Sequence, residues 1–569
     1  MTKRNALGAI LCAVALSACG EGGNGGSESG FGYVVADQCG YVPSESKTAL
    51  LLTRGSKFEV RDSTLKVVLS GNVGMPVFWP EYGDSVRIID FSSINLPGEY
   101  IVSVDDTLMS YPFVISDTIY HDALRKAARA FYYNRASMSI EKEFGGKWAR
   151  PAGHPDDSVL VHKSAASAAR PEGTVISSPG GWYDAGDYNK YIINSAISTY
   201  TLLLASNTFA PIADTLSLNI PESGSDLPDL TSETLYNLRW MLTMQDPNDG
   251  GVYAKLTALG FEGFIMPADC RKTRYVVAKS TAAALDLAAT AAYASRTLRE
   301  RSRSLRRLAK TCEQVSLAAY KWAKANPDVI FHNPEDVLTG EYGDIDINDE
   351  WFWAASEMWL MTGDKKYAAD AVAHHAHFGV PSWGSVGTLA YYSMVDAGKA
   401  VPGIDPAAEL KSLADSLLTI EAASPINLSL RDFDWGSNST IANHAMLKAM
   451  AYNASADKPS DYVASLRNDL HYIFGRNATA YSFVTGVGCY YPMHIHHRPS
   501  AADGVMEPIP GFLAGGPNTV VPTDCGVKPA RSQYPARAYA DELCSYSTNE
   551  VAINWNAPLV FALLAAMSL

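Results

Sequence analysis

The sequence has too little positive charge for a protein that binds nucleic acid or an anionic membrane surface. Its 569 residues contain 46 Lys and Arg against 60 Asp and Glu, which gives a formal net charge of -14. Nucleic acid and anionic lipid head groups both require clusters of basic side chains. We therefore expect no nucleic acid partner, and a neutral substrate is compatible with this charge balance.

Cysteine is scarce, and no two cysteines have CxxC spacing. Apart from the two cysteines of the first 19 residues, the chain has Cys39, Cys270, Cys312, Cys489, Cys525 and Cys544. A structural zinc ribbon is therefore not expected. The sequence leaves open which of these thiols pair and which stay free.

Beyond the N-terminus, no apolar run is long and uncharged enough to span a membrane. The N-terminus itself indicates export, because two basic residues precede an apolar run from Ala6 to Leu16. Leu16-Ser-Ala-Cys19 resembles the lipobox of bacterial lipoproteins, and a plain secretory signal is the alternative. We interpret residues 1–19 as a lipoprotein-type signal peptide with a lipid anchor at Cys19, the only membrane attachment expected. Gly20 favours the bacterial outer membrane or cell surface, and residues 20–30 are predicted to be a flexible tether.

A chain of this length exceeds one usual hydrophobic core, so a small and a large domain are expected. Residues 31–117 contain about seven short strand-like runs separated by turn residues such as Pro97-Gly98. This pattern predicts a small all-β sandwich. Packing or spacing is the simpler role for this domain, and sugar binding is the alternative.

Residues 118–569 have apolar residues at helical spacing in about twelve segments. We expect helices at 122–137, 190–206, 232–245, 278–297, 303–325, 349–361, 366–378, 385–397, 406–421, 439–454, 459–474 and 548–568. Paired helices in this number predict a mainly α fold, a closed α/α toroid. The long non-helical interval 475–546 is typical of loops that serve a functional site.

Two aspartates lie in Gly180-Gly-Trp-Tyr-Asp184-Ala-Gly-Asp187-Tyr188, before a helix expected near Asn189. Acids at a helix N-terminus are stabilised by unpaired backbone N–H groups, so helix capping is one interpretation. Capping does not account for two aspartates three residues apart with aromatic neighbours. Catalysis is therefore the competing interpretation.

Two further segments carry polar groups. His496 and Arg498 are spaced so that both lie on one side of an extended loop, where they offer donors to hydroxyls or a carboxylate; metal binding and ordinary loop packing are the alternatives. Glu550 is expected to open the last helix, capped by Thr548 or Asn549. Aromatic neighbours Tyr546 and Trp555 would raise its pKa, as a general acid requires, and a helix-dipole partner is the alternative.

Together these segments resemble glycoside hydrolase family nine, the inverting β-1,4-glucanases with an (α/α)6 barrel. The C-terminal stretch from Tyr539 to Ala557 fits the family pattern at every defined position, including Asp541, Tyr546 and Glu550. Asp184-Ala-Gly-Asp187 fits the aspartate motif. Asp37-Gln-Cys-Gly-Tyr-Val-Pro43 resembles the start of the immunoglobulin-like domain that precedes the barrel in one subgroup of these cellulases.

The resemblance implies a role for each matching residue. Asp187 would be the general base, Asp184 would help to hold the attacking water, and Glu550 would be the general acid. His496 and Arg498 would contact the sugar, and Asp541 would help to position these groups. The aromatic side chains expected to line the cleft are Trp182, Tyr546 and Trp555.

The resemblance also bears on metals. Zinc-binding members carry cysteines near the first helix and in the following loop, and residues 134–137 and 161–162 lack them, so no zinc is expected. Calcium is frequent in the family, and Asp349 and Glu350 lie in an acidic run that offers hard oxygen ligands. A solvated acidic loop is the alternative, because Gly384 replaces a family Asp. Calcium is thus a possible structural ion, and no cofactor is required.

The sequence therefore predicts an inverting endo-β-1,4-glucanase that acts on a β-1,4-glucan polysaccharide or oligosaccharide as a monomer. An exo-acting cellodextrinase or a mixed-linkage or branched-glucan hydrolase is the second interpretation. A non-catalytic polysaccharide-binding lipoprotein is the third, and the three acids disfavour it.

Overall fold

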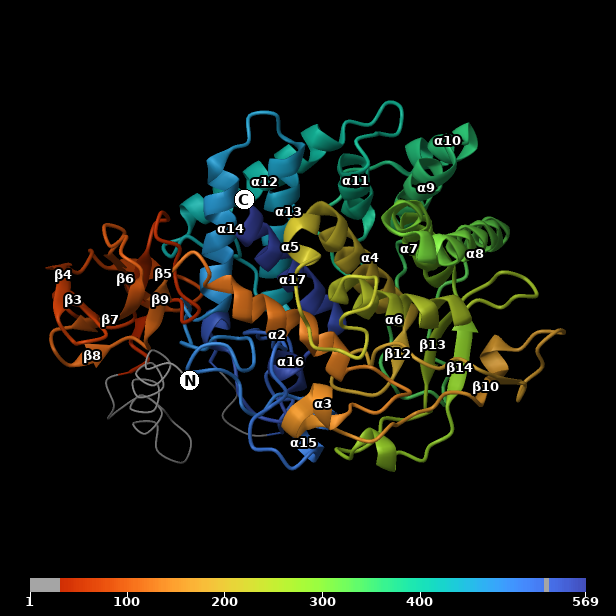
Figure 1. Ribbon diagram of the computed structural model, residues 1–569, viewed down its shortest axis with the longest axis horizontal. Coiled ribbons are helices and arrows are strands. Elements are labelled where there is room, and N and C mark those ends of the chain that lie inside the picture. Colours follow the sequence, from red (N-terminus) through yellow and green to blue (C-terminus); the bar gives the residue numbers. More distant parts are fainter. Residues whose placement is uncertain (1–30, 527–531) are drawn as a thin grey trace.

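The computed structural model describes residues 31–526 and 532–569. Figure 1 shows a β-sandwich on one side of the molecule and a larger helical body beside it. The predicted fold class, an α/α barrel preceded by a small β-sandwich, is confirmed. The signal peptide, the anchor at Cys19 and the tether lie outside the described residues.

The sandwich consists of two antiparallel sheets that enclose one apolar core. The first sheet has the order β1 (Val34–Val35), β2 (Thr48–Leu51), β6 (Asp84–Asp90), β5 (Val77–Trp79). The second has the order β4 (Val67–Asn72), β3 (Lys57–Asp62), β7 (Gly98–Val104), β8 (Leu108–Met109), and β9 (Phe113–Ile115) also pairs with β7. The short strands β5 and β8 were not predicted.

An inner ring of helices forms the centre of the barrel. In order around the ring these are α4 (Ile192–Thr208), α7 (Thr281–Arg301), α9 (Asn348–Thr362), α11 (Gly387–Asp396), α13 (Ser437–Ala454) and α17 (Ile553–Ser568), which packs back on α4. Their residues are buried on almost all sides. A helix that is apolar all round is expected in such a core position.

Each inner helix is paired with an outer helix, and α13 packs against a second one as well. The outer partners, in the same order, are α6 (Asp229–Thr243), α8 (Arg306–Ala325), α10 (Lys365–His374), α12 (Pro406–Ala423), α14 (Ser460–Ile473) and α2 (Tyr120–Tyr133). All twelve predicted helices are present within a few residues of their expected bounds. The short helices α3 (Lys142–Gly145), α5 (Ala210–Ala213), α15 (Arg498–Ala502) and α16 (Tyr546–Asn549) lie in connections.

One end of the barrel carries a small sheet that the sequence did not predict. Its order is β11 (Val175–Ile176), β10 (Val159–Val161), β14 (Tyr275–Lys279), β13 (Tyr253–Thr257) and β12 (Lys190–Tyr191). Strand β12 occupies residues that were expected to begin a helix. As a result α4 starts at Ile192, and the aspartates upstream of it do not cap a helix.

The last helix also differs from the expectation. Helix α17 starts at Ile553, and Glu550 lies in the extended link after α16, with φ of -72° and ψ of 164°. Thr548 and Asn549 do not cap α17 because their side chains bind other loops. Glu550 is therefore held by loops and not by a helix terminus.

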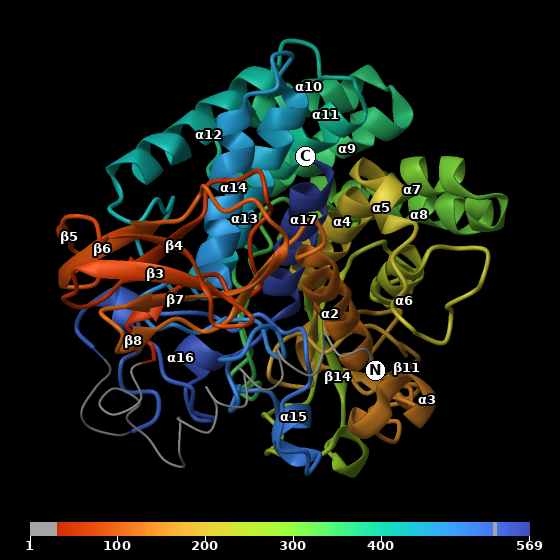
Figure 2. The ribbon, with the colours of Figure 1, turned by 60° about the vertical axis from the view of Figure 1, so that its left-hand side comes forward.

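The sandwich and the barrel share polar contacts, and both ribbon views place the sandwich beside α14 (Figures 1 and 2). The Gln38 amide donates to the carbonyl of Ala480 at 2.7 Å and accepts from the backbone N–H of Cys489 and Tyr490. Oδ2 of Asp37 lies 2.7 Å from Nδ1 of His471. Both side chains are buried, and burial raises the pKa of Asp37 and lowers that of His471.

Within residues 31–526 and 532–569, none of the helices combines the length and apolar character that a membrane crossing needs.

Candidate active site

A cleft of about 960 Å³ brings together residues from distant parts of the chain. Its walls include most of the residues that the sequence selected: Asp184, Asp187, His496, Arg498, Tyr546, Glu550 and Trp555. Such a volume accommodates several sugar rings of an extended chain. The three acids therefore face one space.

Gly186 connects the two acidic segments. Its backbone N–H donates to Oε1 of Glu550 at 3.2 Å. Its carbonyl accepts from the backbone N–H of Arg498 at 3.1 Å and from Nη1 of the same residue at 2.7 Å. A Cβ at this position would lie 2.1 Å from the carbonyl oxygen of His496, so only glycine allows this approach.

Glu550 has the environment of a proton donor. Its backbone forms a parallel bridge with His496, which holds the carboxyl in the wall of the cleft. Desolvation in the cleft, followed by the negative charge of Asp187, raises the pKa of Glu550 to about 8. It is therefore protonated at neutral pH, as a general acid must be.

The two aspartates each keep one oxygen for a ligand. Oδ2 of Asp184 accepts from the Tyr342 hydroxyl at 2.7 Å and from Nδ2 of Asn194 at 3.1 Å. Oδ2 of Asp187 accepts from Asn189 and, at 3.2 Å, from the Tyr191 hydroxyl. Neither Oδ1 has a hydrogen-bond partner within the described residues. Burial and the charge of Asp187 raise the pKa of Asp184 to about 8.

His496 presents an acceptor to the cleft. Its Nδ1 lies 2.7 Å from the carbonyl oxygen of Leu543, and a carbonyl only accepts, so Nδ1 carries the proton. Desolvation lowers the pKa of His496, which keeps the ring neutral. The Nε2 atom is therefore a hydrogen-bond acceptor suited to a sugar hydroxyl.

Arg498 holds the loops around the acids. Besides its bonds to Gly186, its Nε donates to the carbonyl of Glu262 at 2.9 Å. Its guanidinium lies over the rings of Phe261 and Phe264, 5.4 and 5.3 Å from their centroids. These contacts fix the cation beside the turn that carries the aspartates.

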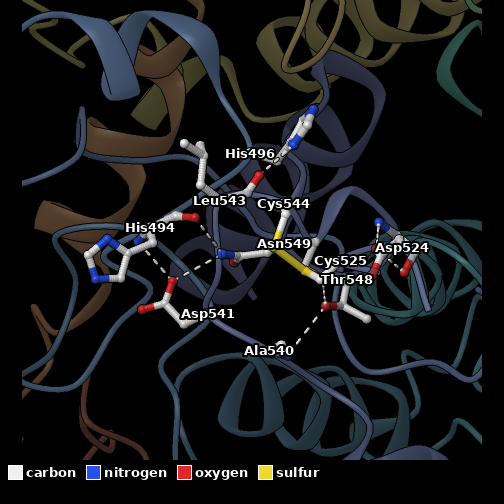
Figure 3. The surroundings of a disulfide bond; sticks show 12 residues. His494, His496, Asp524, Cys525, Ala540, Asp541, Leu543, Cys544, Thr548 and Asn549 are labelled. Carbon is white, nitrogen blue, oxygen red and sulfur yellow. Dashed lines mark hydrogen bonds between the residues drawn. A yellow bond between two sulfur atoms is a disulfide. The ribbon is translucent and has the colours of Figure 1, made fainter. Parts of the chain in front are cut away.

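Asp541 does not line the cleft, and Figure 3 shows its contacts with His494 and Asn549. Its carboxylate accepts from the backbone N–H groups of Met493 and His494 at 2.7 and 2.8 Å, and from Nδ2 of Asn549 at 3.0 Å. It thereby links the loop before His496 to the residue before Glu550. A disulfide between Cys525 and Cys544 secures the same region (Figure 3).

The aromatic predictions divide into two groups. Tyr546 and Trp555 line the cleft, but the expectation for Trp182 is wrong. Trp182 is completely buried, and its indole N–H donates to Glu233 at 2.8 Å. Glu233 is in turn paired with Arg135, so Trp182 belongs to the packed support beneath the aspartates.

Several cleft residues were missed by sequence reasoning. Tyr342 binds Asp184, and Phe261, Trp383 and Trp435 add aromatic surface. Trp435 is 41% exposed, and its ring centroid lies 5.6 Å from that of Tyr546 in the cleft wall. Aromatic residues next to glycine, as in Trp383-Gly384 and Trp435-Gly436, are the signal that was available.

A cluster of carboxyls lies near the predicted calcium ligands. Asp286 from α7 and Glu350 from α9 are buried, and no described donor reaches any of their carboxylate oxygens. Burial and the neighbouring carboxyls, including Asp344 and Asp349, raise the pKa of both groups well above the ordinary range. A cluster of buried acidic oxygens of this kind fits a hard divalent cation. Asp286 was not predicted from the sequence.

An α/α barrel whose cleft combines three carboxyls with exposed aromatic rings defines a polysaccharide hydrolase. The profile of Glycosyl hydrolase family 9 matches residues 120–563, and that of the cellulase N-terminal ig-like domain matches residues 32–108. The chain therefore belongs to glycosyl hydrolase family 9 and is a glycoside hydrolase.

Similar proteins cover nearly the whole chain. It is 39% identical over 555 residues to the xyloglucan-specific endo-beta-1,4-glucanase BoGH9A of Bacteroides ovatus, covering 92% of each protein. It is 33% identical over 541 residues to endoglucanase D of Acetivibrio thermocellus, covering 92% of this chain and 81% of the relative. The solved structure of Bacteroides ovatus GH9 has a TM-score of 0.86 at 36% identity, covering 94% of this chain and 98% of that chain.

Proposed function

We propose that this family 9 hydrolase cleaves internal β-1,4-glucosidic bonds of a β-glucan with inversion of configuration. The observation that carries the proposal is the position of Asp187 and Glu550 on the walls of one cleft. Inversion requires an acid on one side of the scissile bond and a base on the other, with room for water between them.

In the proposed reaction Glu550 protonates the glycosidic oxygen as the C1–O bond breaks. A water molecule held between the free Oδ1 atoms of Asp184 and Asp187 attacks C1 from the opposite face. Asp187 accepts one proton from this water, so the product carries the new hydroxyl with inverted configuration. His496 accepts a hydrogen bond from a sugar hydroxyl and so orients the ring.

Product analysis on defined cello-oligosaccharides tests this proposal. Proton NMR during the first minutes should show the α-anomer of the new reducing end before mutarotation. Cleavage of internal bonds should exceed cleavage at the chain ends. An initial β-anomer would reject inversion. Dimeric products released only from chain ends would reject endo action and favour the exo-acting cellodextrinase.

Xyloglucan is the second candidate substrate, because the 39% identical relative is named as xyloglucan-specific. The cleft volume of about 960 Å³, lined by Phe261 and Trp435 among other residues, supports a branched chain. Comparison of kcat/KM on xyloglucan, mixed-linkage glucan and carboxymethylcellulose separates the candidates. A preference for the unbranched polymer would reject the branched substrate.

We also propose that the carboxyls of Asp286, Asp344, Asp349 and Glu350 bind a structural calcium ion. A cation would neutralise the oxygens that lack a donor in the described structure. Calcium should raise the melting temperature of the chelator-treated protein, and Asp286→Asn should reduce that increase. An equal increase in the melting temperature of the variant would show that Asp286 is not a calcium ligand.

The chain is further proposed to be exported and lipid-anchored at Cys19, and to act as a monomer. The lipobox-like Leu16-Ser-Ala-Cys19 supports the anchor. In a bacterial host, Cys19→Ala should abolish labelling with radioactive palmitate, and persistent labelling would reject this position. Light scattering of the protein produced without its signal peptide should give the mass of one chain, slightly below the 61.4 kDa of the full sequence.

A further inference from the structure

A buried lysine lies next to the side chains that bind Asp187. Lys255 belongs to β13, and it is directly opposite Tyr191 in the antiparallel pair of β12 and β13. It is completely buried, and it is not among the residues that line the cleft. We propose that Lys255 is a positioning residue for the reaction: its charge favours the ionised form of Asp187, and its hydrogen bonds hold the loop that carries Tyr342. This inference rests on the proposed role of Asp187 as the base.

The ammonium group of Lys255 is held by neutral oxygens. Nζ donates to Oδ1 of Asn333 at 2.6 Å, to the carbonyl of Gly340 at 2.9 Å and to Oγ1 of Thr339 at 3.1 Å. These bonds use all three hydrogens of the ammonium. Within the residues that the structure describes, Lys255 forms no ion pair closer than 4.0 Å.

The other buried lysines of the barrel are paired directly. Lys190 contacts Asp156 at 2.8 Å. Lys448 contacts Asp469 at 2.6 Å. A buried charge without a contacting partner is costly, and it acts on more distant acids because the protein interior screens it weakly. The positive charge of Lys255 therefore acts on the acids of the cleft.

Asp187 is the acid with the largest effect on this charge. Nζ of Lys255 lies 5.6 Å from the centroid of the Tyr191 ring, and the Tyr191 hydroxyl donates to Oδ2 of Asp187 at 3.2 Å. Burial lowers the pKa of Lys255 to about 8, whereas the charge of Asp187 and then that of Glu341 oppose this shift. Lys255 is thus protonated at neutral pH. Attraction between two charges is mutual, so the ammonium stabilises the ionised carboxylate of Asp187 in return.

The acids around Asp187 have the opposite effect. Burial, followed by the charge of Asp187, raises the pKa of both Asp184 and Glu550, so either carboxylate, once ionised, repels that of Asp187. Arg498 is a second cation near this turn, and its charge opposes the raised pKa of Glu550. Lys255 opposes the repulsion that would favour a protonated Asp187.

The remaining titratable groups around Asp187 are neutral. Burial raises the pKa of the Tyr191 hydroxyl well above its ordinary value, so this group keeps its proton and donates to the carboxylate. Desolvation lowers the pKa of His496, so its ring carries no charge at neutral pH. Neither group supplies a positive charge to Asp187.

A chain of hydrogen bonds also runs from Lys255 to Asp187. Because the ammonium donates to Thr339, the Thr339 hydroxyl can donate to Oγ1 of Thr257, 2.8 Å away. The Thr257 hydroxyl donates to Oδ1 of Asn189 at 2.8 Å, and Nδ2 of Asn189 donates to Oδ2 of Asp187. Each donor in this chain is directed toward the carboxylate, which favours its ionised form.

Lys255 also fixes the loop that leads to Tyr342. Gly340, whose carbonyl accepts from Nζ, lies two residues before Tyr342 in the chain. The Tyr342 hydroxyl donates to Oδ2 of Asp184 at 2.7 Å. A Cβ at Gly340 would lie 3.0 Å from the Tyr191 hydroxyl, so the loop packs directly against Tyr191. One lysine is therefore connected to both aspartates of the turn.

The pH profile of the intact enzyme tests the proposal, because the acidic limb of kcat/KM reports ionisation of the base in the free enzyme. Lys255→Met removes the charge, so ionisation of the base should require a higher pH. We expect the acidic limb on a soluble β-glucan to move up by at least about one pH unit. KM should change less than about twofold, because Lys255 does not line the cleft. An unmoved limb in the folded variant would overturn the role of the charge.

Asn333→Asp is a second test that leaves the lysine in place. Oδ1 of Asn333 already lies 2.6 Å from Nζ, so a carboxylate there would neutralise the ammonium. The acidic limb should again move up, by at least about half a pH unit. Circular dichroism establishes which variants are folded. If Lys255→Met does not fold, an unmoved limb in Asn333→Asp overturns the proposal.

Lys279→Met is the matched control. Lys279 lies on β14 of the same sheet, and its Nζ contacts Asp246 and Asp249, each at 2.8 Å. Its loss should lower the melting temperature but leave the acidic limb in place, and an equal shift of the limb would reject a specific role for Lys255. Asp187→Asn separates this inference from the proposed function. Full turnover of Asp187→Asn would reject the base itself, whereas an inactive Asp187→Asn with an unmoved limb in Lys255→Met would reject only the lysine.

Discussion

The backbone N–H of Gly186 donates a hydrogen bond of 3.2 Å to Oε1 of Glu550, across 364 residues of sequence. This bond places the turn with the two aspartates against the residue assigned as the acid. It depends on a backbone approach that a side chain at position 186 would prevent. The relative position of the proposed acid and base therefore depends on this backbone N–H group.

Gly186→Ala should reduce both activity and stability. The added Cβ would meet the carbonyl oxygen of His496 at 2.1 Å, so the turn must shift away from Glu550. Overpacking of this kind costs about 1–3 kcal/mol. Gly263→Ala is the control, since its Cβ meets nothing within 4 Å. Equal kcat in the two variants would contradict the importance of this approach.

Glu550→Gln should remove most turnover and preserve oligosaccharide binding. The amide keeps the size of the side chain but cannot donate the proton, and loss of a general acid lowers the rate about 10²–10⁴-fold. The measurements are kcat on cello-oligosaccharides and calorimetric binding. Glu542→Gln, an exposed acid in the same segment, should behave like the unchanged enzyme. Full activity of Glu550→Gln would reject the acid assignment.

Asp187→Asn should also lose turnover, because the amide cannot accept the proton of the attacking water. Azide added to this variant can replace water as the nucleophile without needing a base. We expect any rescued product to carry the azide in inverted configuration. A rescued product with retained configuration, detected by NMR, would show that the inverting assignment is wrong.

The raised pKa of Glu550 predicts a pH dependence of stability. The folded chain keeps a proton that the unfolded chain releases above the ordinary pKa of 4.5. The free energy of unfolding therefore falls as pH rises from about 4.5 to about 8, and this contribution is constant above that range. In Glu550→Gln, the free energy of unfolding measured with denaturant should decline less as pH rises, because only the contribution of Asp184 remains. Parallel curves for the two proteins would contradict the raised pKa.

Two tryptophans should give opposite phenotypes. Trp435→Ala removes an exposed cleft ring and should raise KM about tenfold, or about 1.4 kcal/mol, without lowering the melting temperature. Trp182→Phe removes the hydrogen bond to buried Glu233 and should lower the melting temperature with little effect on KM. A raised KM in Trp182→Phe but not in Trp435→Ala would indicate that Trp182 contacts the substrate.

Helical periodicity predicted the barrel well, because an apolar stripe can be recognised within one segment. Tertiary contacts decided what the sequence could not. Thr548 and Asn549 resemble helix caps, but Asn549 donates to Asp541 and accepts from Tyr539, so the helix starts later. Trp182 resembles a sugar platform in sequence, yet its partner Glu233 lies 51 residues away. Whether a side chain of a given type packs in the core or lines the cleft depends on contacts with residues distant in the sequence, which no local pattern records.

The interface between the sandwich and the barrel has a consequence for biosynthesis. The sandwich leaves the ribosome first, but Asp37 and Gln38 bind groups at His471, Ala480 and Tyr490, more than 400 residues later. Until residues 471–490 have been synthesised, the Asp37 carboxylate has only the backbone N–H groups of Cys39 and Gly40 as partners, and the Gln38 amide lacks its partners at Ala480, Cys489 and Tyr490. The sandwich can therefore dock on the barrel only after most of the chain has been synthesised. Chains truncated before residue 471 would leave this polar surface of the sandwich exposed.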